Sequence, residues 1–265
     1  MGKLKPGFTF TGPLGNISVY PMRGVDDPVV RTKGGASKED IKTKDVFERT
    51  RQLNAEFGGR AKGSKWVMNM LWPQKQLADY NIAGPINSLL RSIQALDTES
   101  KPGQRHVVLS KKPRLLEGFS LNKKNTFDST VRYPLSWQID RDTLTARVEI
   151  PELVPGINFF APPDQPMYSF VATLGLVPDL FYNGNGYEPS TNVFIELGSL
   201  QTATGWFPVQ KGSPASALEI KYTRRPADES FSMIFSIGIR YGMPVDTDTV
   251  QQSKRVGAAK VLAMA

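Results

Sequence analysis

Three pairs of carboxylates are the residues whose types and spacing come nearest to a catalytic or metal-binding pattern. They are Asp26–Asp27, Asp140/Asp142 and Asp246/Asp248. Paired carboxylates hydrolyse glycosides or bind cations, but aspartate is also a preferred residue of turns, and all three pairs lie among turn-forming residues. The third pair resembles the start of a calcium loop, yet it lacks the glycine and the distal glutamate that such a loop requires. We therefore predict turns, with no metal site and no cofactor.

The chain offers little cysteine or histidine that could serve as a nucleophile or a general base. It contains no cysteine and a single histidine, His106, which has no carboxylate near it in the sequence to orient its ring. The patterns GxSxG and HExxH, the Walker motif and the dinucleotide-binding fingerprint are all missing. The sequence predicts a protein that is not an enzyme.

One loop is the best candidate for binding a small ligand. The segment FYNGNGYEPSTN, residues 181–192, places two tyrosines and three asparagines around glycines. Tyr182, Asn183, Asn185 and Tyr187 have the groups that would stack on and hydrogen-bond to a sugar ring or a base. The alternative is a glycine-rich connection between two strands. A carbohydrate-binding module is one of the functions that this loop keeps open.

The net charge of +8 is unevenly distributed. Residues 1–125 contain 22 Lys and Arg against 11 Asp and Glu, whereas residues 126–265 contain 11 against 14. The basic half would bind a polyanion such as nucleic acid, or it would lie on the acidic half of a neighbouring subunit. The polyanion-binding candidates are Lys33, Lys38, Lys42, Arg49, Arg51, Arg60, Lys62 and Lys65.

The elements that would position these residues are mainly strands. Between residues 107 and 243, apolar and polar residues alternate in a series of runs, and one hairpin is expected over residues 131–150 with a turn at residues 140–142. Alternation of this kind is typical of antiparallel sheets with one solvated face. We predict a mainly β (α+β) fold whose body, residues 107–243, is an antiparallel β-sandwich.

The segment before this body reads as helical over residues 37–96. A first helix is expected to start at Thr43 and to end at Gly58–Gly59, a second to cover residues 64–72, and a third to follow Pro85. Their apolar stripes indicate packing on the sheet, with Trp66 and Trp72 as a possible contact with another subunit. A polar linker is expected at residues 97–106 and a strand at residues 115–121.

Both ends of the chain suggest contacts with a neighbour. Residues 1–36 form an arm with two β-prone runs, 17–20 and 29–32, and a hairpin of this size is marginal in water. Residues 244–265 form a tail that ends in small apolar residues, which add a strand either to the chain's own sheet or to a neighbour's edge. The predicted interface residues are Ile17, Val19, Tyr20, Val29, Val30, Arg31, Trp66, Trp72, Val261 and Leu262.

The first quarter of the chain resembles a group of uncharacterised bacterial proteins, of the kind found in Bacteroidota. The resemblance depends on Gly15–Asn16, on residues 31–35 and on residues 56–59. It implies a bacterial origin and no activity, cofactor or site.

The function favoured by the sequence is a structural subunit that assembles with itself into a filament, tube or shell through its arm and its tail. The alternatives are nucleic-acid binding and carbohydrate binding. No run of eighteen apolar residues and no secretory signal is found, which predicts no membrane partner and a place in the cytoplasm or in a released particle.

Overall fold

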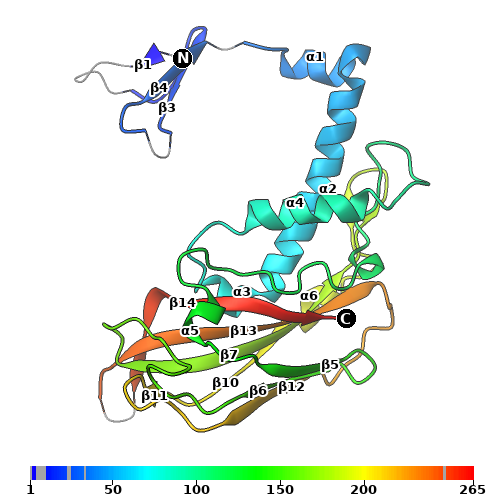
Figure 1. Cartoon of the computed structure of the whole chain (residues 1–265). Coiled ribbons are helices and arrows are strands. Elements are labelled where there is room, and N and C mark those ends of the chain that lie inside the picture. The colour runs from blue at the N-terminus through cyan, green and yellow to red at the C-terminus, as the bar shows by residue number, and fades with distance from the viewer. Residues whose placement is uncertain (1, 4–9, 23–24, 33, 247–248) are drawn as a thin grey trace. The chain divides into compact units, whose positions relative to one another are not determined.

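A computed structural model describes residues 2–3, 10–22, 25–32, 34–246 and 249–265. The chain divides into two compact units, residues 1–51 and residues 52–265 (Figure 1). The division lies at residue 51, and the polar segment 97–106, predicted as a linker, belongs to the second unit.

The first unit is built around a small antiparallel sheet. Its strand order is β1-β4-β3-β2, from strands at Gly2–Lys3, Gly12–Leu14, Ile17–Tyr20 and Val29–Thr32 numbered β1 to β4 along the chain. Strand β3 pairs with β4, and Val19 lies opposite Val30. The predicted N-terminal hairpin is therefore confirmed, and the structure adds a strand on either side of it. Among the described residues of this unit, the buried apolar side chains are Val19 and Val29.

A short helix follows the sheet. Helix α1 (Lys38–Thr43) begins at Ser37, whose hydroxyl accepts a hydrogen bond from the Asp40 N–H, while the Asp40 carboxylate accepts one from the Ser37 N–H. This reciprocal pair is a capping box, which satisfies two backbone donors at once. Thr43 was expected to begin a helix, but its hydroxyl donates to the Glu39 carbonyl at the end of this one. A 3-10 turn, Asp45–Phe47, connects α1 to α2 (Glu48–Met70).

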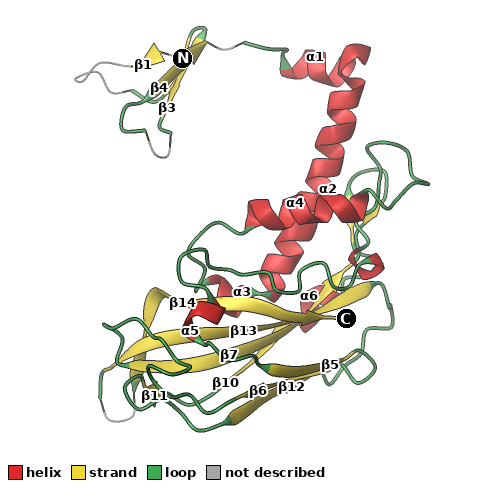
Figure 2. Cartoon of the chain, in the orientation of Figure 1, coloured by secondary structure: helices red, strands yellow, loops and turns green. Residues whose placement is uncertain are grey.

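The second unit contains a central antiparallel sheet (Figure 2). Its strand order is β10-β7-β13-β14, with β11 also paired to β7. Strands β7 and β13 are buried along almost their whole length, because both faces of the sheet are covered. The strands are β7 (Met167–Pro178), β10 (Ser199–Ala203), β11 (Phe207–Pro208), β13 (Phe231–Pro244) and β14 (Val250–Met264).

A second, three-stranded sheet covers one face of the central sheet. Its order is β12-β6-β5, from β5 (Ser136–Asp140), β6 (Thr145–Ile150) and β12 (Ser216–Lys221). The inward residues Ala146, Val148 and Ile150 of β6 pack against the aromatic and aliphatic side chains of β7 and β13. Two antiparallel sheets with their apolar faces together form the predicted β-sandwich. The hairpin expected over residues 131–150 is present as β5 and β6.

Helices cover the other face of the central sheet (Figure 1). Val67 and Met70 of α2, together with Ile86 and Leu90 of α4 (Ala83–Gln94), join Val171, Ile234 and Val261 of the sheet in a second buried cluster. Helix α3 (Trp72–Lys75) lies between them in the chain. The predicted packing of the apolar helical stripes on the β body is therefore observed. The body thus has three layers, two of sheet and one of helix.

Helix α2 runs through the glycines that were expected to end it. The prediction of two helices separated at Gly58–Gly59 is wrong, because α2 is continuous to Met70. A Cβ at Gly59 would lie 2.7 Å from the Tyr187 ring, and one at Gly63 would lie 3.1 Å from Leu90. These glycines allow neighbouring side chains to approach the helix closely, which is a packing role rather than a C-cap.

The tail is a strand of the chain's own central sheet. Strand β14 pairs with β13 along its length, with a shift of register between Arg240 and Gly242. The strand predicted at residues 115–121 is instead a turn-rich segment with one isolated bridge, between Ser120 and Lys260. Its backbone covers the outer edge of β14, where the Val261 N–H donates to the Phe119 carbonyl.

The other short elements connect these layers. They are the 3-10 turn Leu109–Lys111, helices α5 (Phe127–Thr130) and α6 (Val193–Leu197), and the paired strands β8 (Phe181–Tyr182) and β9 (Tyr187–Glu188).

The segment 97–106 is held in place by one carboxylate. Asp97 accepts hydrogen bonds from the backbone N–H groups of Glu99, Ser100 and His106, at 3.2, 3.0 and 2.8 Å. Burial acts to raise the pKa of Asp97, but the hydrogen bonds from His106 and Ser100 outweigh it and hold the pKa below its usual value.

We expect Asp97→Asn to lower the free energy of unfolding at neutral pH by about 1.5–3 kcal/mol, the usual worth of hydrogen bonds to a charged group. Because the folded-state pKa lies below the unfolded value, the contribution of Asp97 is present above pH 3.8 and is lost as the pH falls through the folded pKa. Urea unfolding of both proteins at neutral pH and down to pH 2 measures this, and the difference should shrink only below pH 4. A difference independent of pH would contradict the assignment.

Candidate functional site

A groove beside α2 is lined by residues from three separate sequence predictions, which concern polyanion binding, a subunit interface and a ligand loop. It has a volume of about 390 Å³, and one wall comes from α2 while the other comes from the segment between β9 and β10. Lys62, Lys65 and Trp66, predicted to bind a polyanion or a neighbour, line the first wall. Glu188 and Asn192, from the end of the predicted ligand loop, line the second. The groove therefore combines an aromatic ring, amides and charges in one place.

The walls of this groove are fixed by packing and by charge. Trp66 is half-buried and packs against both core clusters, so one part of the ring is held while another lines the groove. The Lys62 ammonium forms an ion pair with the Glu188 carboxylate across the groove. Asn69 and Ser199, which the sequence analysis did not single out, also line it. Asn69 lies four residues after Lys65 and Ser199 more than a hundred residues after it, and no sequence motif indicates that these residues share a site.

The tip of the predicted ligand loop is engaged in its own turn. The Asn183 carboxamide oxygen accepts the N–H groups of Asn185 and Gly186, and the Tyr182 hydroxyl donates to the Gly184 carbonyl. Tyr187 is buried against α2, with its hydroxyl 3.4 Å from the Gln94 amide nitrogen. Burial, followed by the nearby Glu56 charge, raises the pKa of Tyr187 to about 12. The assignment of Tyr187 as a ligand residue is thus corrected, because its side chain is part of the core.

The predicted polyanion-binding residues are divided between the two units. Lys33 lies outside the described residues. Lys38, Lys42 and Arg49 are exposed in the first unit. Arg51, in contrast, donates to the carbonyls of Ile41 and Lys44, both at 2.8 Å, and so holds the turn after α1. In the second unit, Arg60 donates to Gln94 at 2.6 Å, and Lys62 is ion-paired. Lys65 is the exposed cation of that group that lines the groove.

The predicted interface residues differ in how far their side chains are exposed. Val19 and Val29 are buried inside the first unit, whereas Ile17, Tyr20 and Val30 are half-buried and Arg31 is exposed. The Arg31 guanidinium lies 5.4 Å from the centre of the Tyr20 ring. Trp72 is 55% exposed, with the Lys75 ammonium 5.3 Å from its ring centre.

Val261 and Leu262 do not belong to an exposed surface. Both side chains are buried, and the backbone of Val261 is hydrogen-bonded to Phe119 and Gly118 on the side away from β13. The tail adds a strand to its own sheet, which was one of the two possibilities left by the sequence. Their assignment to a subunit interface is corrected, since β14 already satisfies both its edges over this stretch.

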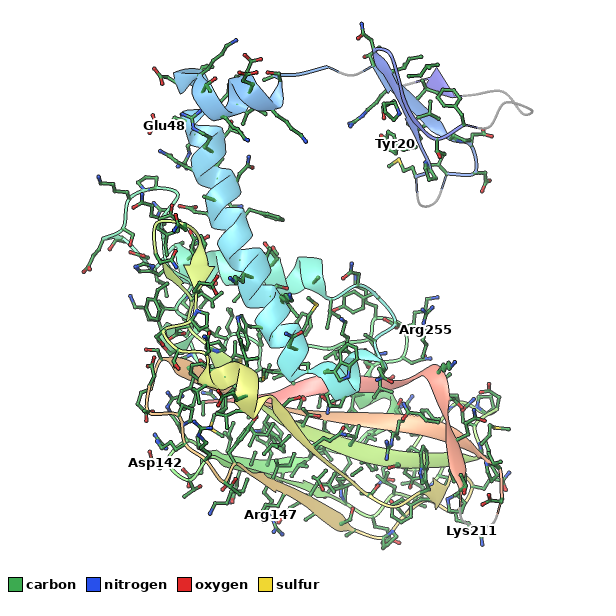
Figure 3. The ribbon with its side chains drawn as sticks, turned by 180° about the vertical axis from the view of Figure 1, so that it is seen from behind. Tyr20, Glu48, Asp142, Arg147, Lys211 and Arg255 are labelled. Carbon is green, nitrogen blue, oxygen red and sulfur yellow. The ribbon has the colours of Figure 1, made fainter. Side chains whose placement is uncertain are left out.

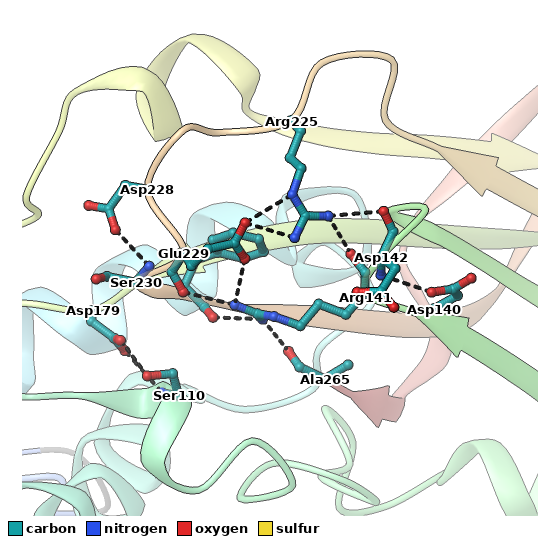
Figure 4. Close-up of polar contacts among 11 residues, drawn as sticks. Ser110, Asp140, Arg141, Asp142, Asp179, Arg225, Asp228, Glu229, Ser230 and Ala265 are labelled. Carbon is teal, nitrogen blue, oxygen red and sulfur yellow. Dashed lines mark hydrogen bonds and ion pairs between the residues drawn. The ribbon is translucent and has the colours of Figure 1, made fainter.

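The polar clusters of the β body have structural roles. Asp179 is buried and accepts hydrogen bonds from the backbone N–H and the hydroxyl of Ser110, at 3.0 and 2.5 Å (Figure 4). Burial raises the pKa of Asp179 above its usual value. The His106 Nδ1 accepts the Tyr182 N–H at 2.9 Å, so this nitrogen is occupied by the backbone. Ser110 and His106 are thus hydrogen-bonded to different partners, Asp179 and Tyr182.

A second cluster joins the β5–β6 turn to the last strand (Figure 4). The Arg141 guanidinium donates to the carbonyls of Glu229, Phe231 and Ala265, at 2.8, 2.8 and 3.2 Å, and lies 4.1 Å from the Phe231 ring centre. Arg225 reaches the same turn by donating to the carbonyls of Arg141 and Asp142. Asp140 accepts the N–H of Asp142, as expected for a turn-forming pair.

Comparisons with protein-family models, with curated proteins and with solved structures find no match for this chain. Within the described ranges, no three His, Asp or Glu side chains come together as metal ligands would. In the same part of the chain, no helix is long and apolar enough to cross a membrane. The fold shown is thus a mainly β, antiparallel sandwich with a helical layer, and its function has to be inferred from the surfaces described above.

Proposed function

We propose that this chain is a non-enzymatic structural protein that assembles with itself through its N-terminal unit. The observation that carries the proposal is the near absence of a core in the described part of that unit. Its four-stranded sheet buries the side chains of Val19 and Val29, while Leu14, Met22 and Val46 are 59%, 48% and 79% exposed. Small sheets without a packed apolar face are marginal in water, so this one needs a surface to cover it.

A second copy of the chain is the partner that fits. Strand β2, which carries Leu14, is the edge of its sheet, and an edge strand is a ready template for pairing with another chain. The body offers a second edge strand, β5, on which Trp137 is 44% exposed. Pairing of two different edges is a head-to-tail contact, which builds rings or open filaments.

The alternatives have less support. Of the eight residues predicted to bind nucleic acid, Arg51, Arg60 and Lys62 already have partners within the protein. The tip of the loop predicted to bind carbohydrate uses its asparagine to close a turn. The tail is no longer part of the proposed contact, because β14 is paired on both edges at Val261.

The test is size-exclusion chromatography with light scattering on the full chain, at low and high salt. We expect a high-order species that is converted to monomers by Leu14→Asp combined with Met22→Asp, because a charge cannot be buried unpaired in an apolar contact. The matched control is Ile157→Asp, a residue of the second unit that is 74% exposed. This control should assemble like the wild type. A wild-type monomer at both salts, or an equal effect of the control, would overturn the proposal.

A further inference from the structure

A second groove of the body is lined by cations without acids. It has a volume of about 480 Å³ and lies between α3 and the start of β14. Its charged lining residues are Lys75, Lys254 and Arg255, and the rest are Gln76, Ala78, Gln252 and Ser253. Its size lies within the range of small-molecule sites. None of the residues that line this groove was individually predicted from the sequence to bind a ligand or a partner.

Some basic side chains of the protein are paired with acids, as in Lys62–Glu188, Arg147–Glu219 and Arg225–Glu229. Within the described residues, Lys75, Lys254 and Arg255 form no ion pair, and the Lys75 ammonium lies over the Trp72 ring. The carboxylate of Asp79, one turn after Lys75, accepts the backbone N–H groups of Lys123 and Lys124. The groove therefore has an excess of positive charge.

The backbone at Arg255 is strained. Its φ is +59°, in the left-handed region, which costs an L-residue about 1–2 kcal/mol. Residues 253–256 form a bulge where the register of β14 against β13 shifts, since Gln252 pairs with Gly242 but Gly257 pairs with Arg240. Figure 3 shows Arg255 at the bend of this strand, on the outside of the body. Bulges commonly redirect a side chain next to a functional site, and here the bulge presents two cations.

Both walls of the groove are fixed to the central sheet. On the α3 side, the buried Gln74 amide donates to the carbonyls of Val171 and Ser236, at 3.0 and 3.3 Å. On the bulge side, the buried Asn122 amide donates to the carbonyls of Leu77 and Gly257, at 2.7 and 3.1 Å, and accepts the Ala259 N–H at 2.9 Å. The amide of Asn122 thus ties the end of α3 to the end of the bulge. The backbone that carries these cations therefore does not have to be ordered when a ligand binds.

We infer that this groove binds the phosphate groups of an anionic ligand. A planar guanidinium and two ammonium groups match the charge and the oxygen geometry of phosphates, and the amides of Gln76 and Gln252 would supply further donors. The volume exceeds that of one ion, so the ligand would carry several phosphate groups. They could belong to a free polyphosphate compound or to the backbone of a nucleic acid.

The test is calorimetric titration of the full chain at low salt, once with inorganic tripolyphosphate and once with a decathymidylate oligonucleotide. The decisive variant is Arg255→Gly, because glycine adopts the left-handed conformation without strain while the guanidinium is removed together with its side chain. We expect its affinity to fall by at least about tenfold, the usual effect of losing a charged hydrogen bond. Its thermal unfolding temperature should be no lower than that of the wild type, which shows that folding is intact.

Lys221→Gln is the matched control, since Lys221 is exposed on β12 in the three-stranded sheet, outside the groove. It should bind like the wild type. Binding of either probe that is lost in Arg255→Gly and kept in the control supports the site, and the probe that binds identifies the source of the phosphates. No binding of either probe, or equal affinities of the two variants, would overturn it. Because neither probe reports on self-assembly, the result is independent of the proposed function.

Discussion

Gly212→Ala is expected to lower the free energy of unfolding by at least about 3 kcal/mol, combining backbone strain with overpacking. Gly212 is buried with a φ of +72°, and a Cβ there would overlap the Leu153 carbonyl oxygen. That oxygen accepts the Ser213 N–H, while the Leu153 N–H donates to the Ser213 carbonyl. The overlap is with backbone that is hydrogen-bonded on both sides, so it cannot be relieved by turning a side chain.

The matched control for this prediction is Gly184→Ala. Gly184 also has a positive φ, +94°, but it is exposed, and nothing lies within 4 Å of the added methyl group. Both substitutions reduce the freedom of the unfolded chain equally. The excess loss at Gly212, expected to be about 2 kcal/mol or more, therefore measures the overlap alone. Urea unfolding followed by circular dichroism gives both values, and equal losses would show that the connection after β6 is not fixed at this point.

The second large effect is expected in the core between the two sheets. Phe235 lies in the middle of β13, fully buried, opposite Leu174 of β7 and Ala263 of β14. Phe235→Ala removes a ring from this core and should lower the free energy of unfolding by about 3–5 kcal/mol. The two flanking strands are paired with β13 along most of their length, so the surrounding structure has little freedom to close the cavity.

Phe57→Ala provides the same chemical change on a surface. Phe57 is 57% exposed on α2, and alanine is the better helix former, so the loss should be below about 1 kcal/mol. Thermal and urea unfolding of the two variants distinguish the sites. A small loss for Phe235→Ala would mean that the three-stranded sheet does not close on β13 as described.

The two surfaces proposed as functional differ in how the rest of the protein supports them. Among its described residues, the N-terminal unit buries the apolar side chains of Val19 and Val29, and the role proposed for it depends on a partner that covers its sheet. The cation-lined groove, in contrast, has walls that Gln74 and Asn122 tie to the central sheet by hydrogen bonds.

The sequence by itself determined the class of fold. Strict alternation along residues 145–150 requires one buried face, and the hairpin formed where the aspartates of residues 140–142 predicted a turn. The N-terminal hairpin was also predicted correctly, since two β-prone runs flank a turn-forming segment. These features depend on contacts close in the chain or on a period of two, which local patterns record.

Other features were decided only by the tertiary structure. Gly58 and Gly59 read as a helix end, but the helix continues through them, and Tyr187, more than a hundred residues away, packs where a Cβ would lie at Gly59. The apolar tail read as a possible interface, but its neighbours β13 and residues 118–121 satisfy its edges. The cations of the second groove come from α3 and from the bulge of β14, which only the closed sheet brings together. Long-range packing of this kind leaves no periodic trace in the sequence, so the structure alone could reveal it.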